Sequence, residues 1–326
     1  MIIFDSNFML HRVLSIPDFA SLEYNGKQTG GIYGFLCTLN TVVGAVPSGH
    51  KIIAVFDGKH SERRKKYFEG YKANRKAYNE EEKIFKDEYF KLFNFQKKII
   101  TNEILPSLGV LPITLSDREA DDVIYRICEM FQSTEEVIVI SEDKDMLQLL
   151  THFPNVTVFR PIAKQRVQRS NFKELFNMPW ELFLIYKSLV GDKSDGIPGI
   201  AGVGPVTVTG VLEKIDINDA IPSLLKYVQT LHETEVQNQR KTSSKEAKIF
   251  TNWGTFARNL ELIDLSREDF TNAELISLKQ AIEGFTPKVY VDFFRNKCYE
   301  FGFQSILKDF NYWLAPFEMV AGVKTS

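Results

Sequence analysis

The sequence predicts an α/β fold, with a mainly parallel central sheet, helices on both faces of it and a helical C-terminal region. In residues 1–169, short runs rich in β-branched residues alternate with longer amphipathic segments, which is the pattern of strands joined by crossover helices. From about residue 170 the strand pattern fades and helical character takes over. We therefore expect an α/β core over residues 1–169 and a mainly helical region over residues 170–326.

The individual elements follow from the same patterns. The expected strands are residues 1–5, 50–57, 109–115, 135–141 and 155–160. The expected helices between them are residues 29 to about 46, 79–108 and 117–131. Residues 256–317 are helical in character and rich in aromatic side chains, and we expect them to bury that surface against the core.

The composition is that of a folded protein of a reducing compartment. The 326 residues are 44% hydrophobic and 13% aromatic. No run of about 18 apolar residues is present, and the N-terminal residues lack the pattern of a secretion signal. The three cysteines, Cys37, Cys128 and Cys298, fit neither a disulfide framework nor a zinc site. We expect a cytoplasmic protein without a membrane partner.

Acidic residues form five short clusters, most of which follow predicted strands. Asp5 and Asp57 end the first two strands, and Asp143 follows the fourth. Because sites in such sheets form at the carboxyl ends of the strands, these side chains are expected to share one. Carboxylates at this density repel one another unless cations neutralise them, and hard divalent metals prefer oxygen ligands. The candidate metal ligands are Asp5, Asp57, Glu119, Asp121, Asp122, Asp143, Asp145, Asp192 and Asp195.

A basic segment lies between the second strand and the long helical stretch. Residues 59–76 hold eight Lys or Arg and two Glu, although the net charge of the chain is −2. A basic segment beside an acidic metal site favours nucleic acid as the substrate. Four of its cations could bind DNA or form a solvated helix face: Arg63, Arg64, Lys65 and Lys66. Lys72 and Arg75 lie three residues apart beside Tyr71, where a Lys charge and an Arg fork could steer a scissile phosphate.

Residues 196–215 contain a glycine-rich turn before a helical stretch. Gly199, Gly202 and Gly204 permit a tight turn and a close approach of the backbone to a phosphate. An ordinary packing corner between two helices is the alternative.

In combination, these motifs resemble the 5′-3′ exonuclease and flap endonuclease family, particularly its bacteriophage, ribonuclease H-like members. The resemblance covers residues 1–215 and is carried by an aspartate on the first strand, VFDG, EADD, S-x-D-x-D and GD-x-SD-x-IPG followed by GVGP. It implies a PIN-like 5′-nuclease core with an arch segment near residues 59–100. It also implies a helix–hairpin–helix-type motif at residues 196–215 that grips duplex DNA.

The family's activity and site residues are carried over as implications of this resemblance. The activity would be hydrolysis of phosphodiester bonds in 5′-flap or nicked DNA and in RNA–DNA hybrids, with two magnesium or manganese ions. The first ion would lie among Asp5, Asp57, Glu119, Asp122 and Asp143, and the second nearer Asp145, Asp192 and Asp195. Asp121 would be the weakest ligand, because its side chain should point about 100° away from that of Asp122 on a helix.

Other residues have implied roles of their own. Lys72, Arg75 and Asp143 would be catalytic, and the ring of Tyr71 could stack on a base. The family often holds a potassium ion at the glycine-rich motif. Thr207 stands where many members carry a lysine, so Lys214 could contribute to duplex binding instead.

Two alternatives remain open at this point. A PIN-type ribonuclease for single-stranded RNA would share the clustered carboxylates, but the glycine-rich duplex motif argues against it. A catalytically weak DNA-junction binding protein would not require the full acidic set with Lys72 and Arg75. We expect a monomer whose partners are flap or nicked DNA, RNA–DNA hybrids and a replication protein at the C-terminal region. If a phage encodes the chain, its location would be the host cytoplasm.

Overall fold

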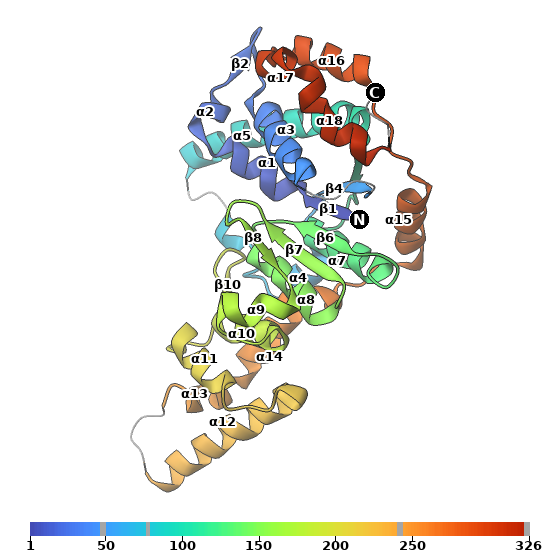
Figure 1. Ribbon diagram of the computed structural model, residues 1–326. Helices are drawn as coiled ribbons and strands as arrows, with labels where there is room; N and C mark the ends of the chain where they lie inside the picture. Colours follow the sequence, from blue (N-terminus) through green and yellow to red (C-terminus); the bar gives the residue numbers. More distant parts are fainter. Residues whose placement is uncertain (46–49, 76–78, 240–243, 323–326) are drawn as a thin grey trace.

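The computed structural model describes residues 1–45, 50–75, 79–239 and 244–322 (Figure 1). Its centre is a six-stranded sheet with the strand order β5-β4-β1-β6-β7-β8. The strands are β1 (Ile2–Asp5), β4 (Ile52–Phe56), β5 (Leu111–Thr114), β6 (Val137–Ile140), β7 (Val156–Arg160) and β8 (Gln165–Val167). All neighbours pair in parallel except β8, which is antiparallel to β7. The mainly parallel sheet and its five predicted strands are confirmed.

Both faces of the sheet are covered by helices. Along β1, Ile2 and Phe4 join one hydrophobic cluster, while Met1 and Ile3 join the other, because successive side chains of a strand point to opposite faces. The first face is covered by α1 (Ser6–Leu14), α3 (Gly30–Gly44), α5 (Glu80–Ile99) and α18 (Phe310–Val320). The second is covered by α7 (Ala120–Phe131), α8 (Leu149–His152), α9 (Arg169–Phe176) and α15 (Asn272–Gly284). Burial on both sides explains why the central strands are continuous apolar runs.

The long helix α5 has clear signals at both ends. Asn79 caps it by accepting a hydrogen bond from the backbone N–H of Glu82 at 2.8 Å. Acidic residues fill its first turn and Lys97 and Lys98 its last, which matches the helix dipole. The chain continues through a π-helical turn, η2 (Ile100–Ile104), into α6 (Leu105–Ser107). The helical stretch predicted for residues 79–108 is therefore confirmed.

A group of helices extends away from the sheet, at the bottom of Figure 1. It consists of α10 (Phe183–Val190), α11 (Pro205–Leu212), α12 (Ala220–Gln237), α13 (Ala247–Thr251) and α14 (Trp253–Ile263). These helices bury Leu189, Val208, Leu224 and Phe256 in a cluster of their own. The extension carries the glycine-rich turn away from the edge of the core.

The chain then returns to the core. Helices α16 (Val291–Glu300), α17 (Gln304–Lys308) and α18 lie beside α3 at the top of Figure 1. Phe294 and Phe317 are buried in the same cluster as Phe4 and Phe35. The predicted docking of the aromatic C-terminal residues onto the core is confirmed for these helices. Residues 170–326 thus contribute both to the extension and to the core.

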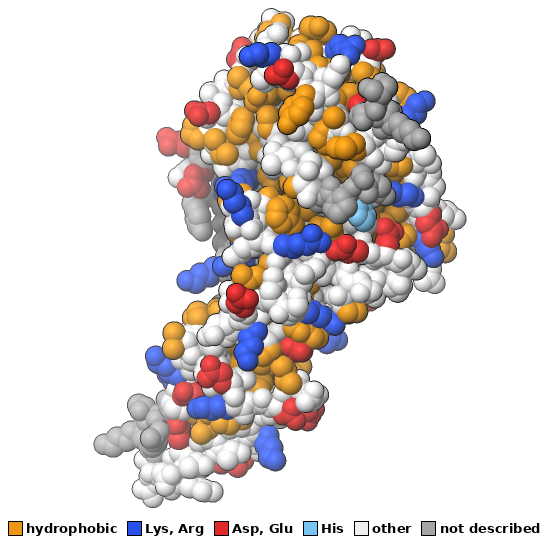
Figure 2. All heavy atoms as spheres, in the orientation of Figure 1, with side chains coloured by type: hydrophobic (Ala, Val, Ile, Leu, Met, Phe, Trp, Pro, Cys, Tyr) orange, Lys and Arg blue, Asp and Glu red, His pale blue; other side chains and the backbone are white. Residues whose placement is uncertain are grey.

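Short elements complete the described chain. They are α2 (Pro17–Ala20), β2 (Glu23–Tyr24), β3 (Lys27–Gln28), α4 (Glu62–Tyr67), η1 (Ala73–Arg75), η3 (Lys144–Gln148), η4 (Trp180–Leu182), β9 (Gly191–Asp192), β10 (Ile197–Pro198), η5 (Ile217–Asp219) and η6 (Leu265–Arg267). Figure 2 shows Lys and Arg interspersed with Asp and Glu on the visible face, and hydrophobic side chains gathered over its upper part. None of the helices in the described residues is long and apolar enough to cross a membrane.

Candidate active site

Three acidic residues follow neighbouring parallel strands. Asp5 ends β1, Asp57 follows β4, and Asp143 comes shortly after β6. Since β1 lies between β4 and β6, the three carboxylates meet at one edge of the sheet. Asp5 is buried and accepts a hydrogen bond from Ser141 Oγ at 2.6 Å. Asp57 accepts one from the backbone N–H of Ala120, the first residue of α7, also at 2.6 Å.

Asp121, in the first turn of α7, joins these three carboxylates. Burial and the charges of Asp143, Asp5 and Asp57 raise the pKa of Asp121 well above its ordinary value. Burial also raises the pKa of Asp5, against the hydrogen bond from Ser141, and the charges of Asp143 and Asp57 add to the rise. A cation among these four carboxylates would relieve the repulsion.

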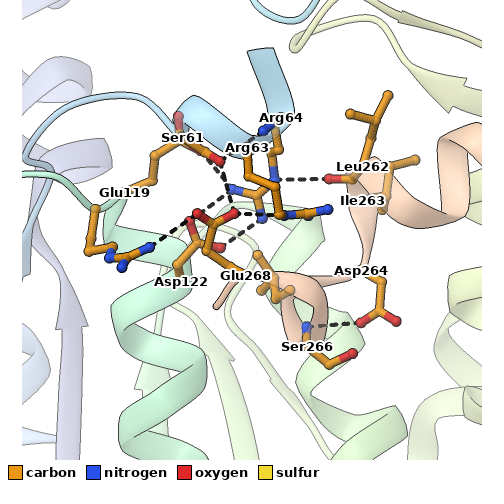
Figure 3. Close-up of polar contacts among 12 residues, drawn as sticks. Ser61, Arg63, Arg64, Glu119, Asp122, Leu262, Ile263, Asp264, Ser266 and Glu268 are labelled. Carbon is orange, nitrogen blue, oxygen red and sulfur yellow. Dashed lines mark hydrogen bonds and ion pairs between the residues drawn. The ribbon is translucent and has the colours of Figure 1, made fainter. Parts of the chain in front are cut away.

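Asp122 points away from this group. The Arg64 guanidinium donates two hydrogen bonds to its carboxylate, Nη1 to Oδ2 at 2.8 Å and Nη2 to Oδ1 at 2.7 Å (Figure 3). Helix geometry predicted that the side chains of Asp121 and Asp122 point in different directions, and they do. The family resemblance, however, placed Asp122 and not Asp121 toward the metal site. Asp121 faces the clustered carboxylates and Asp122 faces Arg64, which corrects the ranking of the two residues.

Glu119 is surrounded by side chains of the arch segment. It accepts hydrogen bonds from Tyr71 Oη at 2.7 Å, Lys72 Nζ at 2.8 Å and Arg64 Nη1 at 3.1 Å, and His60 Nδ1 lies 3.0 Å away. Burial would raise the pKa of Glu119, but the hydrogen bond from His60 and the charges of Lys72 and Arg64 hold it well below its ordinary value. Glu119 is therefore an anion already neutralised by protein cations.

A second acidic group surrounds Lys187 of α10. Its Nζ lies 2.5 Å from Asp145 Oδ1 and 2.9 Å from Asp192 Oδ2. Burial and the charge of Asp143 raise the pKa of Asp145, against the charge of Lys187. Sequence reasoning missed Lys187. The sequence feature that could have identified Lys187 is its place in the last turn of a helix, five residues before the predicted ligand Asp192.

Lys72 and Arg75 lie next to Asp195. Arg75 Nη2 is 2.7 Å from Asp195 Oδ1, and Lys72 Nζ is 3.8 Å from Asp195 Oδ2. The backbone N–H of Lys72 donates to the Asp195 carbonyl at 2.7 Å, and Lys72 has a φ of +53°. The backbone of a non-glycine residue rarely adopts that left-handed conformation. The turn therefore holds Lys72 in one place. The structure brings both predicted cations to the acidic site.

The N-terminal part of the chain, which carries most of this site, matches a known family model. Residues 1–177 match the 5′-3′ exonuclease N-terminal resolvase-like domain. The chain belongs to the 5′-3′ exonuclease family. It is an enzyme of that family, a 5′ nuclease.

Relatives and solved structures extend the match beyond the N-terminal part. A 5′-3′ exonuclease of Aquifex aeolicus is 29% identical over 281 residues, which cover 85% of this chain and 89% of the relative. The structure of the T5 5′-exonuclease with bound zinc matches with a TM-score of 0.62 and 19% identity, covering 92% of this chain and 98% of that one. A bacteriophage T5 flap endonuclease in a complex with DNA and metal ions matches with a TM-score of 0.60 and 18% identity, covering 90% and 96%.

The enzyme has a large cavity between the active site and α5. Its volume is about 1130 Å³, and Asp57, Lys72 and Arg75 line it together with aromatic side chains of α5. The ring of His11 stacks on Phe93 there, with ring centroids 4.0 Å apart. A cavity with a cationic edge and aromatic walls suits a single nucleic-acid strand.

Lys97 is a further cavity residue that sequence reasoning missed. Its Nζ donates to the backbone carbonyl of Asp57 at 2.6 Å. Lys97 lies in the last turn of α5, but the predicted helix continued to residue 108, so no helix-end signal marked it in the sequence.

Two of the predicted DNA-binding arginines are turned inward. Arg64 is 2% exposed, and its Nε donates to the Leu262 carbonyl at 2.9 Å. Arg63 donates from Nε to Glu268 Oε2 at 3.1 Å. Both therefore connect α4 to the C-terminal region, and the predicted DNA contact is wrong for Arg64 in this conformation. Lys65 and Lys66 are exposed, and Lys65 lines the cavity, so their DNA-binding role stays a prediction.

The structure also corrects the expected stacking of Tyr71 on a base. Tyr71 is 4% exposed, and its hydroxyl group is bound to Glu119. Lys72 Nζ lies 5.0 Å from the centroid of its ring, and Arg64 Cζ lies 5.9 Å from it. Tyr71 therefore orients Glu119 and has no open face for a nucleobase.

The three glycines of the turn have different requirements. A Cβ at Gly199 would lie 2.0 Å from the Val190 carbonyl oxygen, so this glycine permits close packing against the end of α10. Gly202 has a φ of +78°, which favours glycine. Gly204 precedes α11 and has open space around it. A Cβ at Gly202 would lie 3.6 Å from Lys248 Nζ, which places a cation beside the turn, whereas Lys214 lies over the ring of Tyr227.

In the part of the chain that the structure describes, the acidic cluster offers a metal ion oxygen atoms but no compact set of ligands. Among the described residues, no three acidic, histidine or cysteine side chains are already arranged to hold a metal ion directly. The four carboxylates of Asp5, Asp57, Asp121 and Asp143 supply only oxygen and repel one another. They fit a hard cation that keeps several of its waters between itself and the protein.

The structural role of Arg64 gives a first prediction. Arg64→Met should lower the free energy of unfolding by about 3–5 kcal/mol, because it leaves the buried Asp122 carboxylate without its cation and removes one of the two cations of Glu119. Urea unfolding measures this. The control is Lys66→Met on the same helix, where the exposed side chain should change stability by less than about 0.5 kcal/mol. Wild-type stability with weakened DNA binding would instead make Arg64 a DNA contact.

Proposed function

We propose that the protein is a metal-dependent 5′ nuclease that hydrolyses phosphodiester bonds in 5′-flap or nicked DNA and in RNA–DNA hybrids. The observation that carries the proposal is the meeting of Asp5, Asp57, Asp121 and Asp143 at one sheet edge, beside a cationic turn. Negative oxygen ligands and protein cations side by side are what cleavage of a phosphodiester requires.

Two magnesium ions, or manganese ions in their place, are the proposed cofactors. Asp5, Asp57, Asp121 and Asp143 would hold the first, with Glu119 at its border. The second would be held by Asp145, Asp192 and Asp195, in exchange for their contacts with protein cations. When bound, such ions supply an activated water and stabilise the leaving oxygen. We propose that Asp122 supports the site through Arg64 and does not touch a metal.

The chain's own cations have separate tasks in this proposal. Lys72, held by Glu119 and by its turn, presents a fixed charge to the scissile phosphate. Arg75 is half exposed and can exchange Asp195 for a phosphate oxygen. The strand that carries the 5′ end would occupy the cavity under α5, between Lys65 and Lys97.

The extension would hold the duplex downstream of the cut. Gly202 and Gly204, together with Val206 and Thr207 in the first turn of α11, have backbone N–H groups that could face a phosphate, and Lys248 adds a cation beside them. A potassium ion at this turn stays a prediction. So do monomeric behaviour, a cytoplasmic location (that of the host if a phage encodes the chain) and a replication-protein contact on the C-terminal helices.

Substrates of matched length separate this function from its alternatives. In magnesium, the enzyme should cut a 5′-flap DNA and an RNA primer on DNA at least about tenfold faster than free single-stranded RNA, because only the first two present a duplex to the extension. Fastest cleavage of free RNA would favour a PIN-type ribonuclease. Tight binding of the flap without cleavage would favour a DNA-junction binding protein.

A further inference from the structure

A buried carboxylate in the C-terminal region contacts the base of the arch segment. Glu268 lies beyond residues 1–177, which match the family model, and its side chain is 5% exposed. Its Oε2 accepts hydrogen bonds from Ser61 Oγ at 2.8 Å and from Arg63 Nε at 3.1 Å. Its Oε1 accepts one from Arg118 Nη1 at 3.2 Å. Figure 3 shows Glu268 at the meeting point of these segments.

The contact with Ser61 fixes the start of α4. Ser61 is the N-cap of this helix, and its Oγ accepts a hydrogen bond from the backbone N–H of Arg64 at 3.1 Å. The same hydroxyl group donates a hydrogen bond to Glu268, so the carboxylate sets the orientation of the cap. The Leu262 carbonyl, six residues before Glu268, holds the other side of Arg64 through Nε at 2.9 Å. Residues 261–268 therefore hold α4 through Ser61, Arg63 and Arg64.

Arg64 transmits this position to the active site. Its Nη1 is 3.1 Å from Glu119 Oε2, and Glu119 Oε1 accepts the hydrogen bond from Lys72 Nζ. A shift of α4 would move Arg64, then Glu119, and then the ammonium group that we propose for phosphate contact. Buried, charged and fully hydrogen-bonded contacts of this kind have few alternative geometries.

We propose that Glu268 is a positioning residue of the nuclease site: it holds α4 and Arg64 so that Glu119 and Lys72 stand in their reactive arrangement. This rests on the proposed roles of Glu119 and Lys72. It gives the segment between α14 and α15 a part in catalysis, although that segment does not line the large cavity.

A general role in stability does not account for these contacts. Arg118 has a second acidic partner, Glu274 of α15, at 2.8 Å and 2.9 Å. The connection between α7 and the C-terminal region is thus retained without Glu268. Arg63 likewise keeps a hydrogen bond from Nη2 to the Glu261 carbonyl at 2.9 Å without Glu268. The contact that depends on Glu268 itself is therefore the one with Ser61, the N-cap of α4.

The test compares Glu268→Gln with Glu274→Gln in the full chain. The two carboxylates share Arg118 as a partner, but only Glu268 contacts α4, and a Gln preserves the capping box that Glu274 forms with Thr271. Glu268→Gln should lower kcat on a 5′-flap DNA about tenfold with KM changed less than about twofold, because misplaced groups lose rate before binding. Glu274→Gln should retain kcat within about twofold.

Hydrogen exchange tests the contact between Glu268 and α4 without a substrate. In Glu268→Gln, the amides of residues 62–68 should exchange about tenfold faster, and those of the central strands should not change. A third arm combines the variant with Tyr71→Phe, which removes another donor to Glu119. If both substitutions act on Glu119, the fall in log kcat of the double variant should be smaller than the sum of the falls in the two single variants.

The outcomes separate this inference from the proposed function. Faster exchange confined to α4, with the kcat loss and its non-additivity, supports the positioning role. Equal kcat losses in Glu268→Gln and Glu274→Gln, or unchanged exchange in α4, overturn it. A wild-type enzyme that cuts none of the substrates overturns the proposed function instead, and the exchange arm still decides whether Glu268 holds α4.

Discussion

Replacing Asp143 by Asn should strongly slow cleavage of a 5′-flap DNA in magnesium while largely preserving its binding in calcium. Asp143 is the charge common to both acidic groups, since it raises the pKa of Asp5 and Asp121 on one side and of Asp145 on the other. Removing it weakens the attraction of both positions for divalent cations. A loss of about 3–4 kcal/mol in transition-state stabilisation corresponds to a rate about 10²–10³-fold lower.

The variant also has an expected effect on stability that distinguishes a metal ligand from a structural residue. An Asn at this position keeps an oxygen that can accept the hydrogen bond from the Asp145 N–H, which now goes to Asp143 Oδ1 at 2.8 Å. It removes the repulsion with Asp5 and Asp121. The midpoint of thermal unfolding in EDTA should therefore not fall, although activity is lost. In many active sites, a catalytic residue lowers the stability of the fold, so replacing it reduces activity without reducing stability.

A nearby acidic residue outside the cluster provides the control. Asp117 pairs with Lys59 at 3.0 Å, and its side chain is 65% exposed. Asp117→Asn should leave flap cleavage within about twofold of the wild type. Cleavage by Asp143→Asn at the wild-type rate would contradict the assignment of the metal site. A large fall in its unfolding midpoint would make Asp143 a structural residue.

The strand-end carboxylates were predictable because local pattern and topology agree. Apolar runs such as IIAVF identify buried strands, and parallel pairing then brings Asp5, Asp57 and Asp143 to one edge of the sheet. These inferences need only the order of elements along the chain. The fold class and the place of the site follow from it.

Side-chain direction on short elements was not predictable in the same way. Helix periodicity separates Asp121 from Asp122, but the rotation of α7 about its axis decides which of them faces the strands. That rotation is set by packing of Val123, Ile124 and Ile127 in the core. Similarly, Arg64 turns inward because its partner Leu262 comes from a segment 198 residues away. A local charge run carries no information about such partners.

Replacing Lys72 by Ala should lower turnover on nicked duplex DNA about 10²-fold and change the dissociation constant of the duplex less than about threefold. Lys72 is mostly buried and bound to Glu119 at 2.8 Å, so it contributes little to the exposed surface that duplex DNA would contact. Its charge acts where the phosphate becomes more negative during cleavage. Single-turnover rates and calcium binding curves measure the two quantities separately.

Lys65→Ala is the matched control for this variant. Lys65 lines the same cavity and is exposed, but Glu119 receives its hydrogen bonds from Tyr71, Lys72 and Arg64. We expect Lys65→Ala to weaken binding of the single strand in a salt-dependent manner and to leave the single-turnover rate of the saturated enzyme nearly unchanged. Equal losses of turnover and affinity in Lys72→Ala would make Lys72 a binding residue. The active site would then consist of the carboxylates alone, and the left-handed turn at Lys72 would serve only to hold Asp195.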